Sequence, residues 1–290
     1  MKKLVCLVLT VVMLACMAFA VSSCGDKNND ANSSGNTGAT GNTGSSGSAQ
    51  NSEPTEKLIC GVTEYEPMNW RENGVWTGFE TEFALLVGER LGIEVEFQMI
   101  DWAQKFNELN SGAIDAIWNG FTATASEDGV PRMQLCDMSY SYMLNTQCVV
   151  IRTDRAADFR TRDDFAGKTM AAEAGSAGEP EAEDLVGDNG TVIGVAQQIN
   201  TFMEVLSGSV DGAVIDLILA REQTGSGDYA NLTIAFELDP EAYAIGFRKG
   251  DPMRDRVNQV MVELFNEGKV QEIAQRYGVL DNLLLDTNFG

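Results

Sequence analysis

The sequence predicts an α/β fold made of two similar lobes. Two segments read almost alike, Ser111-Gly112-Ala113-Ile114-Asp115 and Ser207-Gly208-Ser209-Val210-Asp211. In each, apolar residues at helical spacing run into Ser-Gly, where glycine favours the left-handed turn that ends a helix. The Val- and Ile-rich run that follows suits a buried strand. A helix–turn–strand unit used twice indicates two lobes, and small molecules bind in clefts between lobes. A chance recurrence of a common junction is the alternative.

Strands and helices alternate from residue 57 onward, which supports this fold class. Apolar runs predict strands at 58–62, 93–97, 114–118, 144–151, 169–172, 191–195, 212–215 and 242–247. Helical spacing predicts helices at 79–91, 103–110, from 178 onward, and at 200–206, 217–222, 253–266 and 270–277. A loop is expected through Asn73-Gly74.

The chain begins with an expected export signal at 1–23. Lys2 and Lys3 precede an apolar stretch at 4–21, which is also close to membrane-spanning length, so an uncleaved anchor is the alternative. The stretch Val21-Ser22-Ser23-Cys24 resembles a bacterial lipobox, whose cysteine is lipidated and becomes the new N-terminus. Cys16 is a rival site, but it would leave an apolar segment at the mature end. We expect Cys24 to carry acyl chains such as palmitate, because more than one chain holds a protein firmly at a membrane.

The segment 24–56 is expected to be the lipidated cysteine followed by a disordered tether. Residues 31–52 contain only Ala, Asn, Ser, Gly, Thr and Gln, a composition that buries too little surface to fold. The tether would keep the folded part near a membrane without fixing its orientation.

Composition excludes several classes of function. The formal net charge of −23 argues against a nucleic-acid partner, because such a partner needs a basic face. The chain has no histidine, which removes Ser-His and Cys-His nucleophile pairs and histidine-containing metal sites. The folded part holds Cys60, Cys136 and Cys148 without metal-type spacing. We expect buried free thiols at Cys60 and Cys148, with a Cys136–Cys148 disulfide as the alternative, and neither cofactor nor metal.

Taken in order, several short motifs resemble the extracellular solute-binding proteins of polar amino-acid ABC transporters. The motifs are Gly61-Val62-Thr63-Glu64-Tyr65-Glu66-Pro67-Met68, Gly78-Phe79-Glu80, Ser111-Gly112-Ala113-Ile114-Asp115, Trp118-Asn119-Gly120-Phe121-Thr122-Ala123-Thr124, Ala174-Gly175-Ser176-Ala177-Gly178-Glu179 and Gly212-Ala213-Val214-Ile215-Asp216. The resemblance implies the type 2 periplasmic-binding-protein architecture, with two α/β lobes joined by a two-strand hinge and a ligand cleft between them. Lobe 1 would comprise 57–149 and 243–290, and lobe 2 would comprise 150–242.

A free amino acid presents a carboxylate and an ammonium group, and the resemblance implies a partner for each. Arginine suits the carboxylate, because its planar fork donates two parallel hydrogen bonds. The family's Thr-x-x-Arg spacing puts Glu127 at that position, which is the wrong charge, whereas Arg132 fits after an insertion. We therefore expect Arg132 to hold the carboxylate. Asp216 is expected to hold the ammonium group at the end of its strand, with a helix N-cap as the alternative.

Further residues are expected to line the cleft, including the aromatic Tyr65 that matches the family. The complete predicted set is Tyr65, Trp70, Trp118, Asn119, Gly120, Phe121, Thr122, Thr124, Arg132, Ser176, Ala177 and Asp216. Core packing is the alternative for Trp70 and Trp118. Glu64, Asn119 and Glu173 are candidates for contacts to the ligand's side chain, and Trp102 is expected in the core.

The expected function is that of a lipid-anchored receptor at the extracytoplasmic face of the cell membrane. It would capture an amino acid by closure of its lobes, as a monomer, and pass the amino acid to the membrane permease of an ABC transporter. A dehydratase-like enzyme with Glu64 or Glu173 as general acid is one alternative, and a ligand sensor is another. The lack of histidine and of a nucleophile motif argues against an enzyme. The identity of the amino acid stays open.

Overall fold

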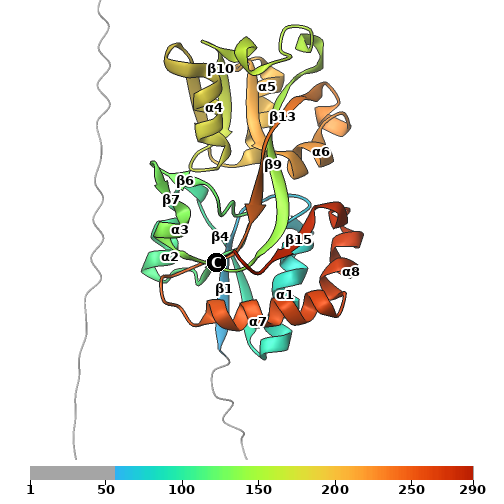
Figure 1. The fold of residues 1–290 in the computed structure, drawn as a ribbon. Helices are drawn as coiled ribbons and strands as arrows, with labels where there is room; N and C mark the ends of the chain where they lie inside the picture. The colour runs from blue at the N-terminus through green and yellow to red at the C-terminus, as the bar shows by residue number, and fades with distance from the viewer. Residues whose placement is uncertain (1–55, 290) are drawn as a thin grey trace, which may run out of the picture. The chain divides into compact units, whose positions relative to one another are not determined.

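Two β-sheets, each with helices on both faces, organise the part of the chain that the structure describes (Figure 1). The structure is a computed structural model, and it describes residues 56–289. The predicted signal, the lipobox at Cys24 and the tether up to residue 55 lie outside the described residues. We call the part built on the sheet β4-β1-β5-β14-β8 lobe 1, and the part built on the sheet β11-β10-β12-β9-β13 lobe 2.

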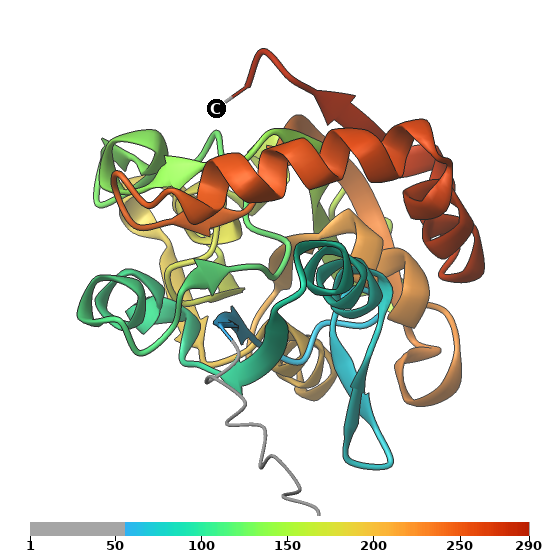
Figure 2. The same cartoon turned by 90° about the horizontal axis from the view of Figure 1, so that it is seen from below.

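Lobe 1 has an apolar cluster on each face of its sheet, because successive side chains of a strand point to opposite faces. On β1, Leu58, Cys60 and Val62 face the cluster formed with α1, α7 and α8, whereas Ile59 faces the cluster that includes α2. Figure 2 shows α7 crossing next to α1, which is seen nearly end-on. The elements are β1 Lys57–Val62, α1 Phe79–Leu91, β4 Glu94–Met99, α2 Lys105–Ser111, β5 Ala116–Ile117, α3 Arg132–Leu135, β8 Asp137–Met138, β14 Gly246–Phe247, α7 Met253–Asn266 and α8 Lys269–Arg276.

Lobe 2 places its helices in the same way. The strands β10, β11 and β12 run parallel, so their carboxyl ends lie at one edge of the sheet. The helix α4 packs on one face of this sheet, and α5 and α6 pack on the other. The elements are β10 Thr169–Glu173, α4 Gly178–Val186, β11 Thr191–Val195, α5 Gln198–Ser207, β12 Gly212–Asp216 and α6 Leu217–Gln223.

Two long strands connect the lobes. The strands β9, Ser141–Arg152, and β13, Leu232–Tyr243, pair antiparallel and run side by side from one lobe to the other (Figure 1). The strand β15, Leu283–Asp286, pairs with the first residues of β9. The lobe boundaries predicted at 149/150 and 242/243 fall inside these two strands, and they stay a prediction.

The predicted strand at 242–247 is wrong. The strand β13 ends at Tyr243, and β14 begins at Gly246 in the sheet of the other lobe. Between them the chain leaves one sheet for the other, and the backbone N–H of Ile245 donates to Ser139 Oγ at 2.8 Å. The run is apolar throughout because it stays buried while it changes sheets, so its hydropathy does not mark the change.

The repeated helix–turn–strand unit is confirmed in both lobes. The helix α2 ends at Gly112 with φ 79°, and α5 ends at Gly208 with φ 76°. Both angles are left-handed, which glycine adopts without strain. Each turn leads into a buried parallel strand, β5 or β12.

Two short hairpins were not predicted. They are β2 Trp70–Glu72 with β3 Val75–Thr77, and β6 Ser126–Glu127 with β7 Val130–Pro131. The first turns through Asn73-Gly74, where both residues have positive φ, as a two-residue hairpin turn requires. The second fills the insertion that precedes Arg132, so the extra residues form an ordered element beside the site.

The cysteine prediction is confirmed. Cys60, Cys136 and Cys148 are free and buried, so the disulfide alternative is wrong. Burial raises the pKa of all three thiols, that of Cys136 to about 12. A thiol with a raised pKa holds its proton and is a poor nucleophile, so these side chains serve packing.

Candidate functional site

Asp216 ends β12, and its carboxylate lies among side-chain amides. Asn145 Nδ2 donates to Oδ1 at 2.8 Å, Gln147 Nε2 donates to the same oxygen, and Gln198 Nε2 donates to Oδ2. The side chain is buried, with 3% of the residue exposed. Asp216 stands at the N-cap position of α6, but its side chain makes no capping hydrogen bond, because its oxygens are directed toward amides of β9 and α5.

A second carboxylate shares the same donors. Glu241 Oε1 on β13 accepts from Asn145 Nδ2 at 2.6 Å and from Gln147 Nε2 at 2.9 Å. Burial, reinforced by the charge of Asp216, raises the pKa of Glu241 to about 7. Burial also raises the pKa of Asp216, although hydrogen bonds from Gln198 and Gln147 lower it in part. Two acids held by neutral amides make this place attractive to a cation.

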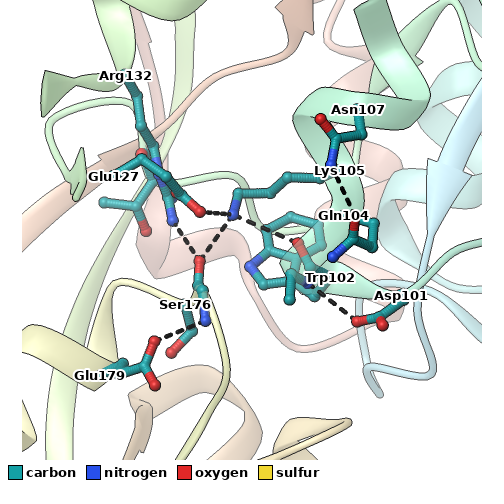
Figure 3. Close-up of polar contacts among 12 residues, drawn as sticks. Asp101, Trp102, Gln104, Lys105, Asn107, Glu127, Arg132, Ser176 and Glu179 are labelled. Carbon is teal, nitrogen blue, oxygen red and sulfur yellow. Dashed lines mark hydrogen bonds and ion pairs between the residues drawn. The ribbon is translucent and has the colours of Figure 1, made fainter. Parts of the chain in front are cut away.

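Arg132 lies buried in lobe 1 where it meets lobe 2 (Figure 3). It begins α3, directly after the β6–β7 hairpin. Nη1 donates to the backbone oxygen of Thr122 at 3.1 Å, and Nη2 donates to the backbone oxygen of Gly175 at 2.8 Å. Nε lies 3.4 Å from Glu127 Oε2, and the guanidinium sits 5.0 Å from the ring centroid of Phe121. The guanidinium group of Arg132 is therefore held in place by Thr122, Gly175 and Glu127.

A second buried cation uses the same partners. Lys105 of α2 donates from Nζ to Glu127 Oε1 at 2.7 Å and to the backbone oxygen of Gly175 at 2.8 Å (Figure 3). Burial lowers the pKa of Lys105 to about 8, as does the charge of Arg132, while Glu127 acts in the opposite direction. Gly175 belongs to the loop between β10 and α4, so one carbonyl of lobe 2 joins two cations of lobe 1.

Hydrogen bonds to other parts of lobe 1 hold the loop after β5 in place. Asn119 Oδ1 accepts from the Thr63 N–H at 3.0 Å, and the Gly120 N–H donates to both oxygens of Glu80, at 2.9 and 3.0 Å. Gly120 has φ 55°, and a Cβ there would lie 2.5 Å from the ring of Tyr65. Glycine is therefore required at this position.

Glu80 of α1 accepts most of the hydrogen bonds that hold this loop and its neighbours. It is fully buried and accepts hydrogen bonds from Asn69 Nδ2 at 2.6 Å and from the Tyr142 hydroxyl. Burial raises its pKa to about 7, and these hydrogen bonds oppose the rise. Next to it, the hydroxyl groups of Tyr65 and Tyr243 share a hydrogen bond at 2.9 Å, which links the first loop of lobe 1 to the end of β13.

A cavity of about 290 Å³ opens between the lobes beside Trp70. Its lining comes from both lobes and consists of Glu64, Glu66, Trp70, Ile199, Leu219, Gln223 and Tyr229. Gln223 Nε2 donates to Glu66 Oε2 at 3.1 Å across this cavity. The structure therefore brings Trp70 and Glu64, two of the sequence candidates, to the cleft between the lobes.

Other sequence candidates lie in the core or at the surface. Trp118 is fully buried and packs edge-on against Phe83, and Phe121 packs edge-on against Trp102. Ser176 and Ala177 are buried at the start of α4, next to the Gly175 carbonyl. Thr122 is buried and contributes its backbone oxygen, whereas Thr124 is exposed.

Sequence reasoning missed Lys105 and the amide residues around Asp216. Asn145 and Gln147 did give a signal, because two amides spaced two apart lie on one face of an otherwise apolar strand. Gln198 begins α5, and nothing in its neighbourhood distinguishes it from a surface residue. Lys105 looks like an ordinary exposed lysine of an amphipathic helix, yet it is fully buried.

Two negative findings concern residues 56–289 only. No helix there combines the length and the apolar character that crossing a bilayer requires. No three Cys, Asp or Glu side chains in that range gather in a way that suits a metal ion.

A sequence model of the bacterial extracellular solute-binding proteins, family 3, matches residues 58–279. The chain is 24% identical over 273 residues to the arginine-binding extracellular protein ArtP of Bacillus subtilis, and the match covers 93% of this chain and 96% of that protein. It is 28% identical over 217 residues to the L-cystine-binding protein TcyA of the same organism, with 73% and 77% covered.

A solved structure shows the same two-lobed fold. It is the substrate-binding protein of an ABC uptake transporter from Streptococcus pneumoniae with bound histidine. The two chains are 29% identical, the match covers 76% of this chain and 92% of that one, and the TM-score is 0.68. This likeness confirms the predicted fold class, the type 2 periplasmic-binding-protein architecture of two α/β lobes.

Raising the pH through neutrality is expected to destabilise the folded protein. Glu80 and Glu241 have a pKa of about 7 and Glu173 of about 8, against 4.5 for an ordinary glutamate. The folded state therefore holds protons that the unfolded chain has released, so stability falls as the pH rises from about 4.5 to about 8. Thermal melts across this range should show a falling Tm. Glu80→Gln should lower the Tm but flatten its slope with pH, and a wild-type Tm that rises across the range would contradict the assignment.

Proposed function

We propose that this chain, which belongs to the bacterial extracellular solute-binding proteins of family 3, captures a free amino acid between its two lobes. It would present that amino acid to the membrane permease of an ABC transporter. The observation that carries the proposal is the presence of two buried groups of opposite charge in different lobes, the carboxylate of Asp216 in lobe 2 and the guanidinium of Arg132 in lobe 1. One zwitterion supplies the opposite charge to each.

Asp216 is proposed to hold the ammonium group of the ligand. Its oxygens accept from three amide side chains, which leave the carboxylate negative while fixing its direction. An ammonium group adds the missing positive charge and up to three donors. The predicted contacts from Ser176 and Ala177 would come from the same lobe, at the start of α4.

Arg132 is proposed to hold the carboxylate of the ligand. In this structure the guanidinium of Arg132 pairs with Glu127. The carboxylate of the ligand would therefore replace the carboxylate of Glu127. Gly120, Thr122 and Thr124 were predicted to assist. Of these, Thr122 already positions Arg132 through its backbone oxygen, and Gly120 is held by Glu80.

Closure about β9 and β13 is proposed as the mechanism, because these two strands connect the lobes. A ligand that touches both Asp216 and Arg132 makes both contacts only when the lobes are together, so it shifts the population toward the closed state. The hydrogen bonds from Lys105 and Arg132 to the Gly175 carbonyl already join the two lobes and would support that state.

A lipid on Cys24 is proposed to anchor the protein at the extracytoplasmic face of the cell membrane, with 24–56 as the tether. The support is the lipobox-like Val21-Ser22-Ser23-Cys24 after an apolar stretch. We propose that the chain acts as a monomer and as a binding protein without turnover.

Cys24→Ser tests the anchor. The variant should move from the membrane fraction to the medium or remain an unprocessed precursor, because no lipid can be attached. Fractionation and immunoblotting of cells that express each form give the readout. Cys16→Ser is the matched control and should leave localisation unchanged. A Cys24→Ser protein that is processed and still bound to the membrane would refute the lipobox.

Asp216→Asn tests the ammonium site. The change keeps the shape but removes the charge, so binding should weaken by about 2–5 kcal/mol. Titration calorimetry with the amino acid that binds wild type most tightly measures the loss. The free variant should stay folded, because the amide still packs at the end of β12. An unchanged affinity would mean that Asp216 does not meet the ligand.

Substitutions of Arg132 and of Glu127 should change the affinity for the ligand in opposite directions. Arg132→Ala should abolish measurable binding, and Arg132→Lys should restore only part of it, since an ammonium group cannot form the forked contact. Glu127→Gln should tighten binding about two- to fivefold, because it removes the internal carboxylate that competes for Arg132. Calorimetry on the three variants decides. Normal binding by Arg132→Ala would exclude this guanidinium as the carboxylate site.

A further inference from the structure

A buried carboxylate beside Asp216 keeps one oxygen without a partner. Glu173 ends β10, the strand that pairs directly with β12, so Glu173 and Asp216 stand at the same edge of the sheet of lobe 2. Only 3% of Glu173 is exposed, and its Oε1 has no hydrogen-bond partner among residues 56–289. A buried acceptor left unsatisfied costs free energy unless a donor reaches it.

Acidic side chains outnumber basic ones around Glu173 within the described residues. Burial raises the pKa of Glu173 to about 8, the charge of Asp216 adds to the rise, and Lys105 of lobe 1 opposes it. Lys105 and Arg132 are both already paired with Glu127. Burial also raises the pKa of Asp216 and of Glu241, so three buried acids at this junction of the lobes lack a cation that would stabilise their charged forms. A ligand with a second positive charge would supply that cation, whereas a zwitterion whose side chain is neutral would not.

Buried oxygen atoms without hydrogen-bond partners also favour a ligand rich in N–H donors. Asn145 Oδ1 and Gln147 Oε1, on either side of the Asp216 contacts, are also buried without a partner among the described residues. Together with Glu173 Oε1 they are acceptors, and they lack donors. A guanidinium carries five N–H donors and an ammonium group carries three. A neutral amide side chain carries two donors and an acceptor of its own, and it brings no charge.

We propose that Glu173 receives a positive charge on the side chain of the ligand, and that the site therefore selects amino acids with a cationic side chain. This inference rests on the proposed capture of an amino acid by Asp216 and Arg132. It assigns a specificity role to a residue of lobe 2 that does not touch the amino-acid backbone groups.

Arginine and citrulline form the matched pair of probes. They have the same length and the same backbone groups, but citrulline replaces the guanidinium by a neutral urea group. Titration calorimetry on the full chain should show arginine binding about 10- to 100-fold more tightly than citrulline, the range expected for a hydrogen-bonded buried charge. Glu173→Gln should reduce that ratio to near one, chiefly by weakening arginine. Glu173→Asp should keep part of the preference.

Glu222→Gln is the control, because Glu222 is an exposed glutamate of α6 and its loss changes the net charge equally. It should leave the ratio unchanged. Citrulline or glutamine binding wild type as tightly as arginine would overturn the role of Glu173 and leave amino-acid capture intact. Failure of all twenty standard amino acids and of cystine to bind would instead contradict the proposed function. If Glu173→Gln does not fold, Glu173→Asp provides the test, and an arginine-to-citrulline ratio equal to that of wild type would overturn the role of Glu173.

Discussion

Buried carboxylates at the carboxyl edge of the sheet of lobe 2 determine what this molecule can do. An ionised carboxylate away from water is costly unless it is hydrogen-bonded and paired with a cation. Asp216 satisfies the first condition through amides from β9 and α5, but the cations nearby belong to lobe 1 and already pair with Glu127. A positive charge from outside the chain would stabilise the ionised form of these acids, and this is the physical basis of the binding site that we propose.

Other parts of the fold orient Arg132 in lobe 1 and Asp216 in lobe 2. In lobe 1, Glu80 fixes the loop after β5 through the Gly120 N–H, and the same loop supplies the carbonyl of Thr122 that positions Arg132. In lobe 2, amides on β9 aim Asp216. Since β9 and β13 run through both lobes, the closure that we propose would bring together groups that are already oriented.

The sequence predicted the two-lobed fold, because periodicity and the Ser-Gly turns are local signals. The ligand roles of Arg132 and Asp216 came from the family resemblance, and they stay predictions. The sequence could not place Lys105, whose burial depends on the Gly175 carbonyl of the other lobe. It also misplaced the strand at 242–247, since a chain that changes sheets without leaving the core looks uniformly apolar. The hairpin that brings Glu127 to Arg132 had no strand signal, because it is only two residues long on each side.

A crystal structure of the chain with L-arginine tests the central claim most directly. The account predicts the ligand's carboxylate on the guanidinium of Arg132 with Glu127 turned away, and the ligand's ammonium group within hydrogen-bond distance of Asp216. A complex in which Glu127 still pairs with Arg132, or in which Asp216 keeps only its amide partners, would contradict it.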